Sequence, residues 1–223
     1  MIRKSILLLF SLIILIVISG CGLLNRKSQT LDLLQNQVCA PPCWQGITPG
    51  TTTFDEAWIV AQSLDSADKG PNDQSPLSIN RDMFSKFITI SYKFAAVGFR
   101  PDSQGIIEEI GFTFGRHWDE PELQHLIEIY GKPISVDICH ELLEIRRAVV
   151  WIRYPDVSFY FSEQLPAEGN LFTVHVRKDA GIDAIYYKSP DVEFPILDFS
   201  FPWSGYSDLT ITPAEKNPLS TCP

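Results

Sequence analysis

Hydrophobic side chains recur at helical spacing in two stretches of the chain. In the first stretch, Ala57 and Leu64 share one face of a helix predicted over about 54–65. Thr53 and Glu56 stand three residues apart at its start, which is the signature of a capping box. This part of the chain therefore predicts an amphipathic helix with a defined beginning.

The second stretch predicts another short helix further along the chain. Asp119 is placed to cap this helix, and Leu123, Leu126 and Tyr130 form its hydrophobic stripe. Gly131 follows the last of these residues and is expected to stop the helix.

Strict alternation of hydrophobic and polar side chains predicts strands elsewhere. One strand is expected over 87–94, and the turn-forming residues 101–105 connect it to a partner over 106–114 as a hairpin. The polar stretch 65–78 is expected to be an exposed loop. After the second helix we expect an extended segment at 134–139, an ambiguous stretch at 140–147, and strands near 148–154, 157–162, 171–177 and 182–187.

Two similar tripeptides indicate a tandem duplication. Phe54-Asp55-Glu56 and Trp118-Asp119-Glu120 lie 64 residues apart, and each opens a helix that is followed by strands. The sequence therefore predicts an α+β fold of two tandem modules, each a short helix followed by an antiparallel sheet. The expected divisions are a first module over 39–115, a second module over 116–190, and an aromatic, proline-rich C-terminal tail over 191–223 packed on the domain.

The first 20 residues have the pattern of a secretory signal peptide. A hydrophobic run of 13 residues from Ile6 to Ile18 follows two basic residues. A membrane-spanning helix needs about 20 residues, so cleavage is favoured over a permanent span. Ile18-Ser19-Gly20-Cys21 resembles the lipobox of bacterial lipoproteins. The resemblance implies lipidation of Cys21, attachment to a membrane through the lipid, and a tether over 21–38.

Charge narrows the range of partners. The formal net charge of the chain is -9, and removal of residues 1–20 would lower it to -11. An acidic chain lacks a polybasic second membrane anchor, and it is poorly suited to nucleic acid. We expect the protein on the extracytoplasmic side of the cell membrane or the outer membrane, and the sequence leaves the choice of membrane leaflet open.

Four cysteines remain beside Cys21, namely Cys39, Cys43, Cys139 and Cys222. An even number in an exported chain predicts two structural disulfides, for which three pairings exist. Cys39 and Cys43 are separated by three residues, which departs from the Cys-x-x-Cys redox motif. Cys139 and Cys222 are not in the close pairs that build structural zinc sites.

A nine-residue segment before the first helix carries a second resemblance. Trp44-Gln45-Gly46-Ile47-Thr48-Pro49-Gly50-Thr51-Thr52 resembles the opening of helix-then-sheet modules in envelope lipoproteins of the SmpA/OmlA type. The tandem arrangement is similar to the beta-lactamase inhibitor protein. The second module lacks this opening segment and keeps only the helix exit at 126–133. The resemblance implies a fold and does not by itself imply a function.

Motifs for catalysis are not evident. The chain has neither a Gly-x-Ser-x-Gly elbow nor a phosphate-binding loop, and in the sequence His140-Glu141 is followed by Glu144 where a zinc helix would have its second histidine. The acidic residues at 65–76 lack the spacing of a calcium loop. We therefore expect no enzyme activity, cofactor or metal site.

The C-terminal tail is rich in aromatic residues, and two interpretations remain open. The candidate side chains are Phe199, Phe201, Trp203 and Tyr206. Either they form a sugar- or peptide-binding surface, or they pack the extended tail against the sheet. The sequence favours a membrane-anchored lipoprotein that binds a protein or envelope partner. The alternatives are an enzyme of unrecognised type and a purely structural envelope component.

Overall fold

The computed structural model describes residues 29–35, 38–65, 76, 78–82, 86–115, 120–141, 147–166, 172–192, 197 and 199–211. The signal peptide, Cys21 and Cys222 lie outside these residues, as do Asp119, most of the loop expected at 65–78, and Glu144. Within the described residues, no helix is both long enough and hydrophobic enough to cross a membrane.

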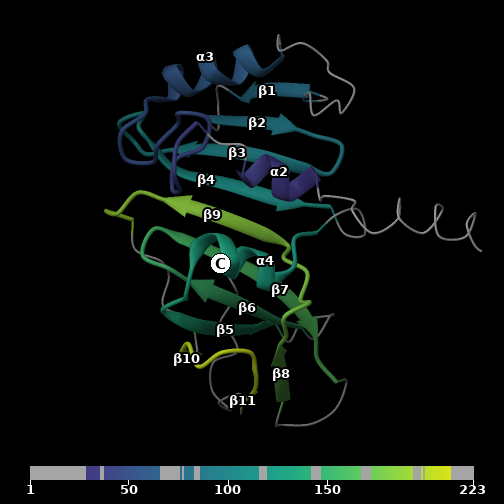
Figure 1. Cartoon of the computed structure of the whole chain (residues 1–223). Helices are drawn as coiled ribbons and strands as arrows, with labels where there is room; N and C mark the ends of the chain where they lie inside the picture. The colour runs from purple at the N-terminus through teal and green to yellow at the C-terminus, as the bar shows by residue number, and fades with distance from the viewer. Residues whose placement is uncertain are drawn as a thin grey trace, which may run out of the picture.

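The chain folds around a nine-stranded sheet in which all neighbouring strands run antiparallel (Figure 1). The strand order is β1-β2-β3-β4-β9-β7-β6-β5-β10. The strands of this sheet span Ser78–Asp82 (β1), Phe87–Ser91 (β2), Ala95–Pro101 (β3), Ile107–Phe114 (β4), Ser135–Glu141 (β5), Arg147–Arg153 (β6), Val157–Gln164 (β7), Ala184–Lys188 (β9) and Phe199–Pro202 (β10). A separate two-stranded sheet pairs β8 (Phe172–Val176) with β11 (Ser207–Ile211).

Among the described residues, three helices pack on one face of the sheet. They are α2 (Gln29–Gln35), α3 (Phe54–Asp65) and α4 (Leu123–Tyr130), and α2 and α4 lie in front of the strands in Figure 1. Their hydrophobic side chains join one continuous core with the inward-facing residues of both ends of the sheet. Mixed helices and antiparallel strands make this an α+β fold.

The centre of the core joins the two ends of the sheet. The ring of Phe112 on β4 lies 5.8 Å from Trp44 and 5.1 Å from Tyr187 on the adjacent strand β9, measured between ring centroids. All three side chains are fully buried. Tyr187 also shares a hydrogen bond of 2.6 Å with the hydroxyl of Tyr130 on α4. Strands from both halves of the sequence therefore depend on one set of aromatic contacts.

The first predicted helix is confirmed, together with its capping box. Helix α3 spans Phe54–Asp65. The Glu56 carboxylate accepts hydrogen bonds from the Thr53 backbone N–H at 2.9 Å and from the Thr53 hydroxyl at 2.8 Å. The Glu56 N–H donates in return to Thr53 Oγ1 at 3.3 Å. Helix α4 begins at Leu123, and its N-terminal cap residue, Glu122, makes no capping hydrogen bond through its side chain.

The predicted hairpin between 87–94 and 106–114 is wrong in its pairing. The first strand ends at Ser91, and the chain turns through 92–94 into β3. Strand β3 pairs with both β2 and β4, so the turn at 101–105 connects β3 to β4. The backbone N–H of Tyr92 donates to the carbonyl of Ala95 at 2.7 Å, which closes a tight turn. Hydrophobic and polar residues continue to alternate through this turn, so the sequence pattern did not indicate it.

The segment 21–38 is not a tether along its whole length. Residues Gln29–Gln35 form α2, in which Leu33 and Leu34 are buried in the core. The Trp44 indole N–H donates to the Leu33 carbonyl at 3.4 Å. A helix of seven residues cannot be stable alone, so the packing of these leucines holds it.

Candidate binding surface

The sheet has a second face, which points away from the three helices and which we call the open face. Its side chains alternate along each strand with those that enter the core. The cross-strand pairing aligns them in rows, one of which runs Asp137, Trp151, Tyr160, Ala184, Thr113, Ala96 and Ser91. The open face therefore continues across both halves of the sheet.

Three aromatic side chains, which we call the aromatic cluster, form the largest feature of the open face. The ring of Trp151 lies 4.8 Å from that of Tyr160 and 5.7 Å from that of Tyr186, and the Tyr160 and Tyr186 rings stack at 6.1 Å. Leu197 packs against this cluster, and only 7% of Trp151 is exposed. Burial is the main reason that the pKa of the Tyr186 hydroxyl is raised.

A buried ion pair adjoins the aromatic cluster. Arg153 Nε donates to Asp137 Oδ2 at 2.8 Å, and the guanidinium lies 4.7 Å from the centre of the Trp151 ring. Asp137 also accepts hydrogen bonds from the Ser135 hydroxyl at 3.1 Å and the Ser200 hydroxyl at 2.7 Å. Burial lowers the pKa of Arg153, and Asp137 acts in the opposite direction. One carboxylate thereby connects β5, β6 and β10.

Charges of alternating sign cross the middle of the open face. Lys188 on β9, Glu109 on β4 and Arg100 on β3 stand opposite one another in register, and we call them the charge ladder. Glu109 Oε2 lies 3.5 Å from Lys188 Nζ and 3.1 Å from Arg100 Nη2. Burial lowers the pKa of Lys188, with Glu109 opposing that shift. Arg100 is 49% exposed, so the ladder runs from a buried cation to one in contact with solvent.

Small side chains occupy the open face beside the ladder. A Cβ on Gly98 would lie 2.5 Å from the ring of Phe87, and one on Gly111 would lie 3.1 Å from the ring of Tyr186. Aromatic rings thus cover both glycines. Alanine and threonine fill neighbouring positions at Ala96 and Thr113.

The four C-terminal aromatic residues, for which a binding surface and packing across the sheet were the two interpretations, lie away from the open face. Phe199 and Phe201 pair with Ile138 and Val136, so they share the core side of the sheet. All four residues are partly buried and pack against the core: Phe199, Phe201, Trp203 and Tyr206. The Trp203 and Tyr206 rings meet edge to face, with 5.7 Å between their centroids. They extend the core past the edge of the sheet and are separate from the open face.

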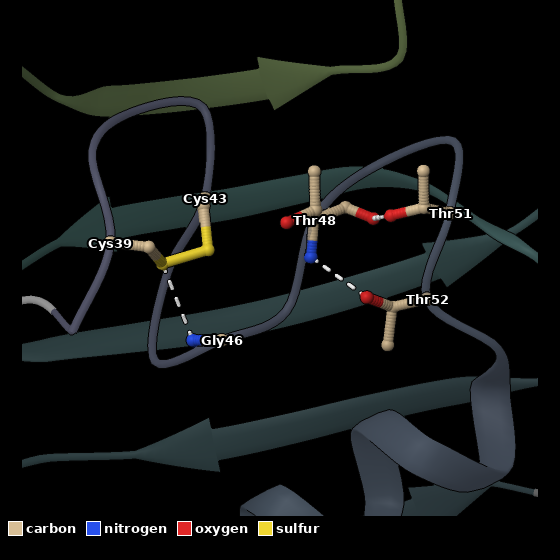
Figure 2. Close-up of a disulfide and its surroundings, with 6 residues drawn as sticks. All are labelled: Cys39, Cys43, Gly46, Thr48, Thr51 and Thr52. Carbon is tan, nitrogen blue, oxygen red and sulfur yellow. Dashed lines mark hydrogen bonds between the residues drawn. A yellow bond between two sulfur atoms is a disulfide. The ribbon is translucent and has the colours of Figure 1, made fainter.

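Cys39 and Cys43 form a disulfide, as Figure 2 shows. Cys43 is buried, whereas Cys39 is partly exposed. Cys139 also belongs to a disulfide. Leu34, Val38, Cys39, Pro41 and Ile129 are among the residues that line an open hollow of about 610 Å³ beside the Cys39–Cys43 loop.

A histidine connects the small sheet to the large one. His175 Nδ1 and Asp208 Oδ1 are 2.8 Å apart across β8 and β11, and the His175 backbone N–H donates to Glu163 Oε2 at 2.8 Å. The hydrogen bond to Asp208, followed by the charge of Glu163, raises the pKa of His175. No cluster of three potential metal ligands occurs among the described residues.

No family model, curated protein or solved structure matches this chain. The candidate site therefore rests on the geometry of the chain itself. Sequence reasoning missed the aromatic cluster and the charge ladder. The sequence offered one signal for a polar feature on this face, namely Arg153. In the predicted strand, Val150 and Ile152 point to one face of the sheet, so Arg153 must point to the other.

Proposed function

We propose that the protein is a lipid-anchored extracytoplasmic lipoprotein that binds a protein partner of the cell envelope through the open face of its sheet. The observation that carries this proposal is the position of the charge ladder and Tyr186 on the face opposite all three described helices. Tyrosine and arginine are enriched at protein interfaces, and charged groups commonly form the polar rim around them.

The charges also favour one kind of partner. Arg100 contacts both Glu108 and Glu109 at 3.1 Å, and it is the most exposed member of the ladder. A partner with charges in the complementary order would be oriented by this array, and a partner with like charges would be rejected. This arrangement suits recognition of a folded protein better than attachment to an anionic lipid surface, because the ladder includes acidic groups.

Capture from detergent-solubilised membranes tests the surface. Arg100→Glu should reduce partner capture at least tenfold, a loss in line with reversing an interfacial charge. Arg177→Glu is the matched control, because Arg177 is also exposed and ion-paired but lies outside the open face. Equal capture by both variants would contradict the open face as the binding surface. Substrate turnover by the purified protein would instead support the enzyme alternative.

We further propose that the soluble part consists of two tandem modules. From one edge of the sheet the strand order is β1-β2-β3-β4. From the other end, inside the edge strand β10, the order is β5-β6-β7-β9. The last strands of the two series, β4 and β9, pair with each other at the centre. Helix α3 precedes the first series and α4 precedes the second. An experimental structure tests this arrangement by superposition of 54–114 on 123–188, and different helix placements over the two sheets would contradict duplication.

The membrane anchor rests on the lipobox-like segment that ends at Cys21. A Cys21→Ala variant should leave the membrane fraction or remain unprocessed, and it should lose incorporation of labelled fatty acid. Unchanged acyl labelling of that variant would contradict lipidation at Cys21.

The disulfide pairing follows by elimination if Cys21 is lipidated. The Cys39–Cys43 bridge leaves Cys139 to pair with Cys222, which would fasten the C-terminal tail to β5. Peptide mapping of the unreduced protein should recover this pair, and thiol titration after denaturation should find no free cysteine. Two free thiols would contradict the pairing.

A further inference from the structure

We propose that Cys39 and Cys43 form a thiol–disulfide exchange site for a cysteine pair of another exported protein. This inference goes beyond partner binding at the open face, and it concerns the helix-bearing side of the molecule. It rests on three features: unequal burial of the two cysteine residues, a backbone donor directed at Cys39, and the hollow beside it.

The two cysteines have unequal access to solvent. Cys43 is 8% exposed and precedes Trp44, which is completely buried in the core. Cys39 is partly exposed at the outer end of the same loop. An incoming thiolate is therefore expected to attack the sulfur of Cys39, with Cys43 as the leaving group.

A rigid backbone turn provides the hydrogen-bond donor. Trp44 and Ile47 exchange backbone hydrogen bonds of 2.9 and 2.8 Å, and the two residues between them have positive φ values of 53° for Gln45 and 84° for Gly46. In such a two-residue turn the N–H of the second residue is not used by the hairpin. The Gly46 N–H instead donates to Cys39 Sγ at 3.4 Å (Figure 2).

This donor favours the charged form of a reduced Cys39. A hydrogen bond to a thiolate stabilises it over the thiol, which lowers the pKa and raises the reactive fraction. Because Trp44 and Ile47 are both buried, the turn should keep its position when the disulfide opens. The core next to the loop is held by its own contacts, so reduction need not unfold the protein.

The hollow gives the partner a place beside Cys39. Hydrophobic side chains from three segments line it, with Leu34 from α2, Val38 and Pro41 from the disulfide loop, and Ile129 from α4. Val38 is 83% exposed, which is unusual for a hydrophobic residue next to a buried core. A partner segment with hydrophobic residues next to its cysteine fits this lining, and Gln35 and Glu128 can meet its polar backbone.

The exchange proceeds in two steps. A thiolate of the partner attacks Cys39 Sγ, which breaks the Cys39–Cys43 bond and forms a mixed disulfide, and the Cys43 thiolate takes up a proton. The second thiolate of the partner then attacks the partner's sulfur in the mixed disulfide. This attack forms the partner's disulfide and releases Cys39 as a thiolate. The partner dithiol is oxidised to a disulfide, while the Cys39–Cys43 disulfide is reduced to two thiols or thiolates.

Single-cysteine variants of the full-length protein in detergent test the unequal reactivity. Cys43→Ser exposes the Cys39 thiol, and Cys39→Ser exposes the Cys43 thiol. With Ellman's reagent as the probe, Cys39 should react at least about tenfold faster than Cys43, with a pH midpoint below the ordinary thiol value of about 8.5. The double variant Cys39→Ser/Cys43→Ser measures the background. Equal rates, or an ordinary midpoint for Cys39, would overturn the proposal.

The wild-type chain provides a test that does not depend on how the variants fold. A reduced peptide with two cysteines flanked by leucines should open the Cys39–Cys43 bond while near-ultraviolet circular dichroism remains native. Mass spectrometry should find the mixed disulfide on Cys39 when the peptide carries only one cysteine. A bond that is reduced only after the fold unfolds would be purely structural and would overturn the exchange site.

Discussion

The open face carries different side chains in the two halves of the sheet. The first half consists of β1 to β4, and the second consists of β9, β7, β6, β5 and β10. On β3 and β4 the open face has small residues, including Ala96, Gly98 and Gly111, and the rings of Phe87 and Tyr186 cover the two glycines. On β6 and β7 it presents Trp151 and Tyr160, and Leu197 packs over them as a second hydrophobic cluster. Both halves place helices on the other face, so the difference arises only from the outward side chains. One half remains available to a partner while the other is largely filled by the chain itself.

The charge ladder lies where these two regions meet. Lys188 belongs to β9 and Glu109 to β4, which are the strands that join the halves. Under the proposed function, a partner on the first half would contact the exposed end of the ladder at Arg100. The filled half therefore has a structural role in this interpretation, and the exposed half is the one that recognises a partner.

The largest expected effect concerns the core that both halves share. Phe112→Ala removes a fully buried ring that contacts Trp44 on one side and Tyr187 on the other. We expect a loss of about 3–5 kcal/mol in the free energy of unfolding, measured by urea denaturation. The two halves should unfold in a single transition. Two separate transitions, or an effect no greater than that of the exposed control Thr113→Ala, would show that the halves are independent.

A second prediction compares the buried and exposed ion pairs. Asp137→Asn removes the carboxylate charge that Arg153 Nε contacts at 2.8 Å, and the Arg153 side chain is only 5% exposed. The expected loss is about 2–4 kcal/mol in the free energy of unfolding. In the first half, Asp55 is 81% exposed in its pair with Arg81, so Asp55→Asn should cost less than about 1 kcal/mol. Similar losses from both variants would contradict the contrast between a buried and an exposed ion pair.

Local sequence signals predicted some elements well and missed others for physical reasons. The boundaries of α3 follow from hydrophobic spacing and the Thr53–Glu56 capping box, which act within a few residues. Strand β1 is short and polar, and α2 has only seven residues, so neither carries a periodic signal long enough to recognise. Their positions depend on contacts with distant parts of the chain.

The candidate site was harder to predict than the fold. Trp151 and Tyr186 meet only because β7 lies between β6 and β9, and this order is not encoded locally. The charge ladder likewise depends on the register of β3, β4 and β9. By contrast, the Cys39–Cys43 pairing was one of the arrangements that the cysteine count allowed, and its short spacing made close approach easy.

A smaller effect is expected at the aromatic cluster of the filled half. Among the described residues, no atom accepts a hydrogen bond from the buried Trp151 Nε1, and a buried indole N–H without an acceptor loses its hydration on folding. Trp151→Phe removes that donor and some ring area together, and the net change in unfolding free energy should stay within about 1.5 kcal/mol. Trp151→Ala is the comparison and should cost about 3 kcal/mol or more. Equal losses of unfolding free energy for Trp151→Phe and Trp151→Ala, measured by urea denaturation, would mean that the indole N–H has a hydrogen-bond partner in solution.

The smallest predicted effect is a pH dependence confined to the β8–β11 sheet. The hydrogen bond to Asp208 and the charge of Glu163 raise the His175 pKa above its ordinary value of 6.5, while burial and Arg177 act against this shift. The proton is bound more tightly in the folded state, so the stabilisation is fully present below pH 6.5. It is lost as the pH rises through the higher folded-state pKa.

Amide hydrogen exchange can locate this effect within the molecule. Protection of β8 and β11 should fall between pH 5.5 and pH 8 relative to His175→Gln, once the intrinsic pH dependence of exchange is removed. The β1–β2 pair is the internal control, because neither strand contains a histidine. A parallel loss of protection in both sheets would reflect global destabilisation instead of the His175–Asp208 contact. A loss restricted to β8 and β11 would assign the effect to the His175–Asp208 contact of the small sheet, which is separate from the sheet that carries the proposed binding surface.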